Sequence, residues 1–457
     1  MGVTFMSKNT LKKELSLTQV IAMAAGGMIA AWMVEIKYWF ELSGVGSLAA
    51  LGLCAILVLF LAEIYSEMTA MLPYAGGSGV WATNAFGWNV GWAANWALLL
   101  LYIMAMPTVT YGISSMIGYF YPITFTQTKI LAVVITILWF FLTNMEIKFL
   151  ARIQNVLFWT TLVVCVVADI IFIFSSHWSI KTMMPIFPNG SRGFFLAVGL
   201  LIFKFIGFDM VPQLAEEANF PRSKVKYAFI GAIGLTFLVY GMAILGVGGI
   251  VSTDWILEVD IVDPRVASLI GMQWLGTLVV VLGIGTCVTT LSGFWLSAAR
   301  SLYAGARQRQ YPLFFEKVNQ SGQPSNANIV VGLLALYFTA FAPENWVNYI
   351  YVIYGVTAGA VYLSVVLSFI KLRKTQPDWE RPHKVKYPAI VSAISLIFIL
   401  WVFIASFAEM NKGGFVVLLI YVTLGLCFWI YARHKQKTDP ENWKPYLINP
   451  ETEKVHD

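Results

Sequence analysis

The chain has 457 residues, of which 58% are hydrophobic and only 12% are charged, and its net charge is +6. Soluble globular domains carry about 25% charged residues, so this composition indicates an integral membrane protein. The basic residues lie mainly between apolar runs, where membrane topology places them, which argues against a nucleic-acid-binding role.

Apolar runs long enough to cross a bilayer recur along the chain, and they predict an all-α integral membrane protein with twelve transmembrane helices. The runs lie near residues 17–40, 45–71, 87–121, 129–147, 154–175, 194–214, 226–250, 266–303, 327–342, 346–370, 387–408 and 413–433. Two of them, 87–121 and 266–303, exceed one crossing and are expected to form long, tilted helices. The first run lacks the cleavage pattern of a signal peptide.

The basic residues predict the orientation of the chain. With the N-terminus inside, most of the 30 Lys and Arg residues fall in cytoplasmic segments. Loops on the other side hold only Lys129, Lys181, Arg192, Arg265 and Lys412. The excess predicts a multi-pass protein of the cell (plasma) membrane with both termini cytoplasmic.

The first run is interrupted at Gly26 and Gly27 and then carries Glu35. Glu35 lies roughly 12 Å beyond the glycine pair at the helical rise of 1.5 Å per residue. A carboxylate at that depth suits a substrate ammonium or a transferable proton, whereas the alternative is that it marks the outer end of the helix. Trp32 adds a bulky ring beside the interruption, where it occupies volume that a ligand would use.

The sixth run carries Lys204, Gly207, Asp209 and Pro212 within its apolar sequence. A charged side chain at the bilayer centre costs roughly 2.5–3.5 kcal/mol, so its default interpretation is functional. A break at Gly207 would turn Lys204 and Asp209 toward one cavity, where Lys204 meets a substrate carboxylate or an acid of the first run. The alternative is an internal Lys204–Asp209 ion pair that only fixes the helix.

Interrupted first and sixth runs predict two inverted five-helix repeats followed by two accessory helices. The expected boundaries are 1–176 and 177–372 for the repeats, 373–434 for the accessory spans, and 435–457 for a cytoplasmic tail. The glycine-rich segment 72–88 is expected to form a short re-entrant or gating element, with a tight turn as the alternative.

Several aromatic residues beside the interruptions or in a long run are candidates for stacking on a cation or closing over a solute: Trp32, Phe203, Phe208 and Phe294. Core packing is the competing interpretation. The four cysteines are far apart, and neither a phosphate-binding loop nor a catalytic cluster of His, Asp, Ser or Cys is present. We therefore expect no cofactor, no metal site and no enzymatic activity.

Three separated segments carry a resemblance to a known family. They read PYAGGSGVWATNAFG, FIGFDMVPQLAEEANFPR and SAARSLYAGARQRQYPLFFEKVNQSGQPSNANIV. Together they resemble the amino acid–polyamine–organocation transporter family over almost the whole chain. The resemblance implies the five-plus-five fold, alternating access, and a central site between spans 1, 3, 6 and 8.

The chain departs from that family at the expected site. Ala30, Ala31 and Trp32 stand where the family has a Gly-Ser-Gly type segment whose amides hold a substrate carboxylate. Glu35 and Lys204 add charge where the family has small or apolar residues. These differences favour an amine substrate such as agmatine or putrescine.

The sequence thus predicts a secondary active transporter, an antiporter or an ion-coupled symporter, of amino acids or related amines. H⁺ coupling, Na⁺ coupling and pure exchange all remain open, as do a monomer and a homodimer. The partners expected are the small-molecule substrate and the lipid bilayer. The alternative is a non-transporting amino acid sensor or subunit with the same fold.

Overall fold

The computed structural model describes residues 13–143, 147–320, 322–344, 346–408 and 410–450. These residues form helices and connecting segments, and their only β-type pairing is an isolated parallel bridge between Leu15 and Ala218. The predicted all-α class is therefore confirmed for the part of the chain that is described.

Within the described part of the chain, ten helical segments are long and apolar enough to cross a bilayer, and Leu17–Met28 and Ser325–Ala340 are shorter apolar helices. The principal helices are α1 (Leu17–Met28), α2 (Trp32–Ser43), α3 (Ser47–Met71), α4 (Ser78–Phe86), α5 (Trp88–Ile117), α6 (Phe125–Leu142), α7 (Ile147–Ile173), α8 (Gly190–Leu201), α10 (Val225–Ile250), α11 (Thr253–Glu258), α12 (Val262–Leu269), α13 (Gln273–Arg307), α14 (Ser325–Ala340), α15 (Trp346–Thr375), α16 (Pro388–Ala408), α17 (Lys412–Thr438) and α18 (Pro440–Trp443).

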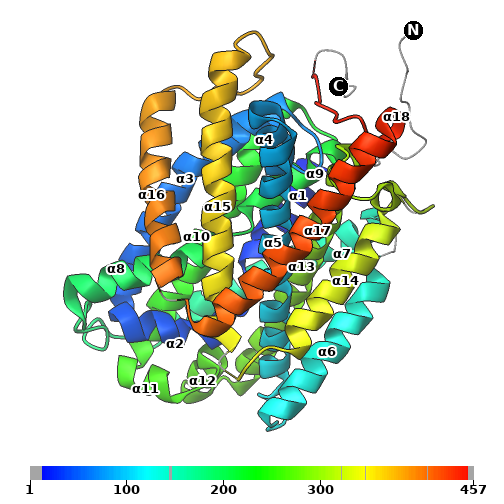
Figure 1. Ribbon diagram of the computed structural model, residues 1–457. Helices are drawn as coiled ribbons and strands as arrows, with labels where there is room; N and C mark the ends of the chain where they lie inside the picture. The colour runs from blue at the N-terminus through cyan, green and yellow to red at the C-terminus, as the bar shows by residue number, and fades with distance from the viewer. Residues whose placement is uncertain (1–12, 144–146, 321, 345, 409, 451–457) are drawn as a thin grey trace.

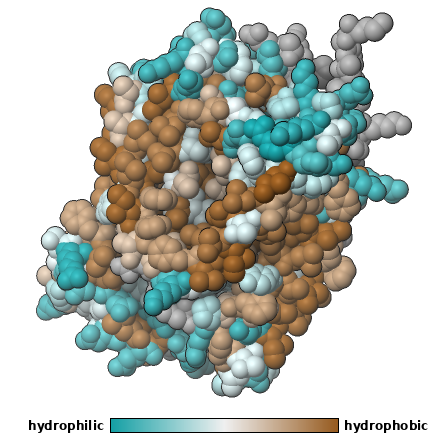
Figure 2. Space-filling view, viewed as in Figure 1, coloured by the Kyte–Doolittle hydropathy of each residue, from teal (hydrophilic) through white to brown (hydrophobic). Residues whose placement is uncertain are grey.

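The helices form one bundle with an apolar middle (Figures 1 and 2). Hydrophobic side chains cover the visible surface between two polar ends, as the hydrocarbon core of a bilayer requires. We call the end that carries α18 the terminal face, and the end that carries α11 and α12 the opposite face (Figure 1). In the middle of the bundle α5 is almost wholly buried and packs against α13, whereas α6 and α17 are mostly exposed.

The first membrane helix is interrupted between α1 and α2. Ile29 is extended and Ala31 adopts the left-handed conformation, with φ of 50°. The interruption therefore lies at Ile29–Ala31, and the prediction that placed it at Gly26 and Gly27 was wrong. Both glycines lie inside α1. They permit close packing there, since a Cβ atom at Gly26 would collide with Thr289 and one at Gly27 with Met210.

The second interruption follows α8. The short helix η2 (Ile202–Phe205) is followed by the extended residue Ile206, and Gly207 has a φ of 134° before η3 (Phe208–Met210) and α9 (Val211–Leu214). A methyl group on Gly207 would lie 3.1 Å from the Gly27 carbonyl carbon and 3.2 Å from the Met28 nitrogen. The second interruption thus packs backbone against backbone on the last residues of α1.

The predicted long helix at 266–303 is wrong at its start. Helix α12 ends at Leu269, Gly271 is left-handed with a φ of 78°, and α13 begins only at Gln273. The Met272 amide donates a hydrogen bond to the Ala267 carbonyl oxygen at 2.8 Å, a helix-ending arrangement that glycine permits. The chain therefore lays α12 along the opposite face before it enters the bundle.

The glycine-rich segment 72–88 contains a short helix, α4, rather than a plain turn. Glu216 and Gln213 hold its first residues, since Glu216 accepts from the Ala75 amide at 3.0 Å and Gln213 accepts from the Gly76 amide at 2.9 Å. This element is therefore tied to the stretch that follows the second interruption.

We predict that Gly207→Ala destabilises the protein. Its φ is one that side-chain-bearing residues rarely adopt, and the added methyl would lie 2.9 Å from Met28 Cγ, so we expect a loss of roughly 1–3 kcal/mol. Thermal unfolding in detergent, followed by size-exclusion chromatography, measures the effect. The matched control is Gly199→Ala in α8, where the methyl meets nothing within 4 Å and stability should be unchanged or higher. Equal melting temperatures for the two variants would contradict the prediction.

Candidate functional site

A buried ion pair joins the two interrupted helices on the side of the opposite face. Lys204 of η2 pairs with Glu35 of α2, and the two residues are only 6% and 3% exposed. The Tyr351 hydroxyl of α15 donates to Glu35 Oε1 at 2.5 Å and accepts from Lys204 Nζ at 3.3 Å. The structure therefore places Lys204 against the acid of the first interrupted helix, one of the arrangements predicted.

Aromatic rings surround the Lys204 ammonium. Its nitrogen lies 6.0 Å from the ring centre of Trp39, 5.9 Å from that of Tyr240 and 5.7 Å from that of Tyr351. Such rings attract a cation through their negative faces and exclude water from it. A single cluster thus holds α2, η2, α10 and α15 together.

Tyr240 also engages the loosened backbone of the first interruption. Its hydroxyl donates to the Met28 carbonyl oxygen at 2.5 Å and accepts from the Ala30 amide at 3.1 Å. One main-chain amide of the predicted substrate cradle is therefore occupied by a side chain. Ala31 next to it is 2% exposed and closely packed.

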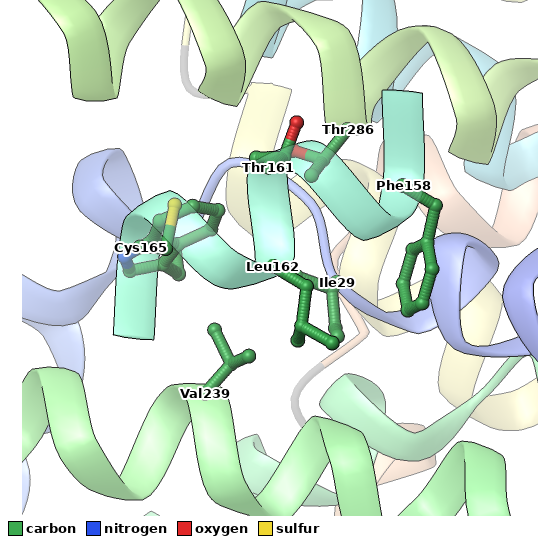
Figure 3. A pocket seen from close by; sticks show the side chains of 8 residues that line it. Ile29, Phe158, Thr161, Leu162, Cys165, Val239 and Thr286 are labelled. Atoms are coloured by element: carbon green, nitrogen blue, oxygen red, sulfur yellow. The ribbon is translucent and has the colours of Figure 1, made fainter. Parts of the chain in front are cut away.

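Trp32 is the first residue of α2, and its ring nitrogen contacts α12. Nε1 donates to Asp263 Oδ1 of α12 at 3.0 Å. Beside the ring lies a narrow apolar gap that is too tight for a water molecule; Phe158, Cys165 and Thr286 are among its lining residues (Figure 3). Trp32 therefore fills space next to the interruption, as expected, and links it to the opposite face.

Asp209 caps the second interruption. Its Oδ1 accepts from the Gly207 amide at 3.0 Å, and Oδ2 has no hydrogen-bond partner among the described residues. The Tyr102 hydroxyl donates to the Asp209 main-chain oxygen at 2.8 Å. Within the described ranges Asp209 forms no ion pair, so the alternative of an internal Lys204–Asp209 pair is wrong.

The predicted aromatic residues separate into two groups. Phe203 lies beside Tyr351 and Tyr354, with ring centres 5.2 and 6.2 Å away, and Phe294 lies 6.4 Å from Tyr354. Phe208 instead packs at 5.0 Å against Tyr65. Phe203 and Phe294 therefore share one aromatic cluster beside the interruptions, whereas Phe208 serves the packing of α3.

A second set of ion pairs lies after the second interruption. Arg300 of α13 donates to both carboxylate oxygens of Glu217, at 2.5 and 2.7 Å, and both side chains are fully buried. Arg307 donates to Glu216 at 2.8 Å. The main-chain oxygen of Glu217 also accepts from the Leu15 amide at 2.9 Å. Ionic contacts thus bracket the interruptions on both sides.

Sequence reasoning missed four buried polar residues, the first two at this site and the last two outside it. They are Tyr240, Tyr351, Asp169 and Asp263. Asp169 was detectable, because it is an acid inside an apolar run. Tyrosines in a chain rich in aromatic residues give no such signal.

Comparison with known proteins places this geometry in a family. The amino acid permease family profile matches residues 15–445, nearly the whole chain. The chain belongs to the amino acid permease family. This confirms the resemblance seen in the sequence, and it makes the chain a member of a family of membrane transporters rather than enzymes.

Three relatives illustrate the range of this family. The branched-chain amino acid permease BcaP of Bacillus subtilis is 24% identical, covering 94% of this chain and 95% of its own length. The aspartate-proton symporter of the same organism is 23% identical, over 93% of this chain and 86% of its own. Its gamma-aminobutyric acid permease is 25% identical, over 80% and 81%. All three are named as carriers of amino acids.

We predict that the two single variants, Glu35→Gln and Lys204→Met, each lose stability. The double variant should lose less than the sum of those two losses. Removing one partner leaves the other charge buried and unpaired, at a cost of roughly 3–5 kcal/mol, whereas removing both leaves none. Thermal unfolding of the two single variants and the double variant in detergent measures the coupling.

The matched control for this cycle is Lys37→Met, because Lys37 lies 3.4 Å from the exposed Asp260 carboxylate. An exposed pair of this kind contributes about 0–1 kcal/mol, so the control should melt close to the wild type. Strictly additive losses for Glu35→Gln and Lys204→Met would contradict the buried pair.

Proposed function

We propose that the protein is a secondary active transporter of amino acids that works by alternating access, with its substrate bound where the two interrupted helices meet. The observation that carries the proposal is the backbone contact of Gly207 with Gly27 and Met28, flanked by buried ionisable groups. Interrupted helices supply unpaired main-chain groups and helix ends to a small polar ligand at mid-membrane. The amino acid permease relatives support the same class of substrate.

The proposed topology has twelve spans. It counts α1 and α2 as one interrupted span, η2, η3 and α9 as part of the sixth, and the short α14 as the ninth. Residues 1–176 and 177–372 then form the two inverted repeats, 373–434 the accessory spans and 435–457 the cytoplasmic tail. This arrangement places both chain ends on one face, in accord with the distribution of Lys and Arg. Residues 451–457 of that tail, and residues 1–12, lie outside the described part of the chain.

Three ionisable residues give the proposed site its charge balance. Glu35 and Lys204 neutralise one another, which leaves the buried Asp209 as an acid without an ion-pair partner among the described residues. We propose that Asp209 receives the ammonium of the substrate, and that Phe203 and Phe294 pack against its side chain. Gly26, Gly27, Ala30, Ala31 and Trp32 line the same region from the first interrupted span.

A second candidate substrate class is an amine without a carboxylate, such as agmatine or putrescine. The observation that favours it is the Tyr240 hydroxyl, which already occupies the Ala30 amide that a substrate carboxylate would use. An uncompensated acid at Asp209 fits a cation equally well. Exchange, H⁺ coupling and Na⁺ coupling are compatible with either class, and one relative is named for proton symport.

Counterflow in proteoliposomes tests the proposal. Vesicles loaded with a mixture of amino acids should accumulate labelled leucine, aspartate, gamma-aminobutyrate or lysine, and unlabelled competitors should include agmatine, putrescine and tyramine. Competition by amines but by no amino acid would assign the protein to the second candidate class. Ligand binding without any flux would instead favour the sensor alternative.

We predict that Asp209→Asn lowers counterflow of the preferred substrate at least tenfold. A hydrogen bond to a charged group contributes roughly 1.5–3 kcal/mol, which corresponds to about a tenfold to hundredfold change in affinity. The control is Asp254→Asn, an exposed acid in the first turn of α11. Wild-type affinity in the Asp209 variant would remove Asp209 from the site.

A further inference from the structure

A polar cavity of about 440 Å³ lies at the terminal face, outside the central site. Three segments enclose it: the last turn of α4, the connection between α15 and α16, and the chain that follows α18. The α15–α16 connection and α18 lie at the same end of the bundle (Figure 1). The residues that line the cavity are Asn84, Gln376, Asp378, Trp379, Leu447, Ile448 and Asn449. This volume suits a small organic molecule, since ligand pockets measure about 300–1,000 Å³.

Hydrogen bonds from one arginine fix the wall that the α15–α16 connection supplies. The Arg381 side chain is 6% exposed, and it donates to the main-chain oxygens of Gln376 and Trp379, each at 2.8 Å. Its Nε donates at 3.1 Å to Glu67 of α3, a fully buried carboxylate. The main chain that carries Asp378 is therefore held in place without a ligand, which lowers the cost of ordering this wall on binding.

The wall supplied by the tail is anchored to the bundle as well. Arg309, just after α13, donates to the Asn442 main-chain oxygen of α18 at 2.7 Å. The Trp443 side chain is buried, and its ring centre lies 5.6 Å from that of Tyr431 in α17. Further along the tail, Ile448 is also buried. The cavity therefore lies between walls that are each attached to the helices by contacts of their own.

The lining residues include one acid and no base. Asp378 is exposed, and it forms no hydrogen bond or ion pair with any residue that the structure describes. Trp379 beside it adds an indole ring, whose face attracts cations. The other polar lining groups are side-chain amides, which both donate and accept hydrogen bonds: Asn84, Gln376 and Asn449. An ammonium group in the cavity would thus meet a carboxylate and an aromatic ring, whereas an anionic group would meet only a charge of its own sign.

We propose that this cavity is a second binding site, specific for a small organic amine without a carboxylate. The ammonium of the ligand lies against Asp378 and the Trp379 ring, and its apolar part packs on Leu447. None of the residues proposed to hold the transported substrate lines this cavity, so the inference does not depend on the transport function. An occupant contacts all three walls at once and holds the tail against α4 and the α15–α16 connection. The residues just before α4 are tied to the stretch after the second interruption, so occupancy reaches the elements of the central site.

Isothermal titration of the full chain in detergent with tyramine, agmatine and putrescine tests the site. Asp378→Asn should weaken binding of an amine about tenfold, because it removes the charge that the ammonium meets. Its melting temperature should not change, since Asp378 has no partner to lose. The matched control is Glu441→Gln, an exposed acid of α18 that does not line the cavity and should bind as the wild type does. Asp209→Asn, which changes the central site, should retain the binding that depends on Asp378.

A matched pair of ligands tests the chemical class. Tyrosine adds only a carboxylate to tyramine, so the binding that depends on Asp378 should be at least tenfold weaker for tyrosine. Equal binding of the two ligands at this site would overturn the class. The absence of binding by all three amines, wild-type affinity in Asp378→Asn, or a loss of binding in Asp209→Asn alone would overturn the site. The transport function is tested separately by counterflow, and none of these results would contradict it.

Discussion

The ion pair between Lys204 and Glu35 is the interaction that joins the two interrupted helices to one another. Each residue belongs to a different interrupted helix, and neither charge has water to stabilise it, so separation requires that a solvent molecule or a ligand replace the lost partner. The Tyr351 hydroxyl ties the pair to α15. The contact of Arg300 with Glu217 is a separate buried ion pair that ties α13 to the stretch after the second interruption.

Sequence alone was sufficient for the class of fold and for identifying the two helices that are interrupted. Charge, glycine and proline inside apolar runs mark Lys204, Gly207 and Asp209 because each is costly at membrane depth unless it has a local purpose. The exact place of the first interruption was not predictable from glycine content. Gly26 and Gly27 serve close packing within α1, while Ala31 adopts the left-handed conformation because tertiary contacts impose it.

The sequence also did not predict which polar side chains contact one another. Lys204 pairs with an acid 169 positions earlier rather than with Asp209 five residues away, because the break at Gly207 redirects the chain between them. Asp209 turns back to cap that break, a local hydrogen bond that periodicity does not encode. The polar contacts of Tyr240 and Asp263 likewise depend on how α10 and α12 dock, and α12 itself was hidden inside an apparently continuous apolar run.

The hydrogen bonds of the Tyr240 hydroxyl limit the affinity that the first interruption can offer to a ligand. It already satisfies both the Met28 carbonyl and the Ala30 amide, so a ligand that reaches these groups trades one hydrogen bond for another instead of gaining a new one. Such a trade yields little net free energy, since a typical hydrogen bond contributes only about 0.5–1.5 kcal/mol to begin with. These two main-chain groups of the first interruption therefore add little affinity of their own for any molecule that displaces the Tyr240 hydroxyl.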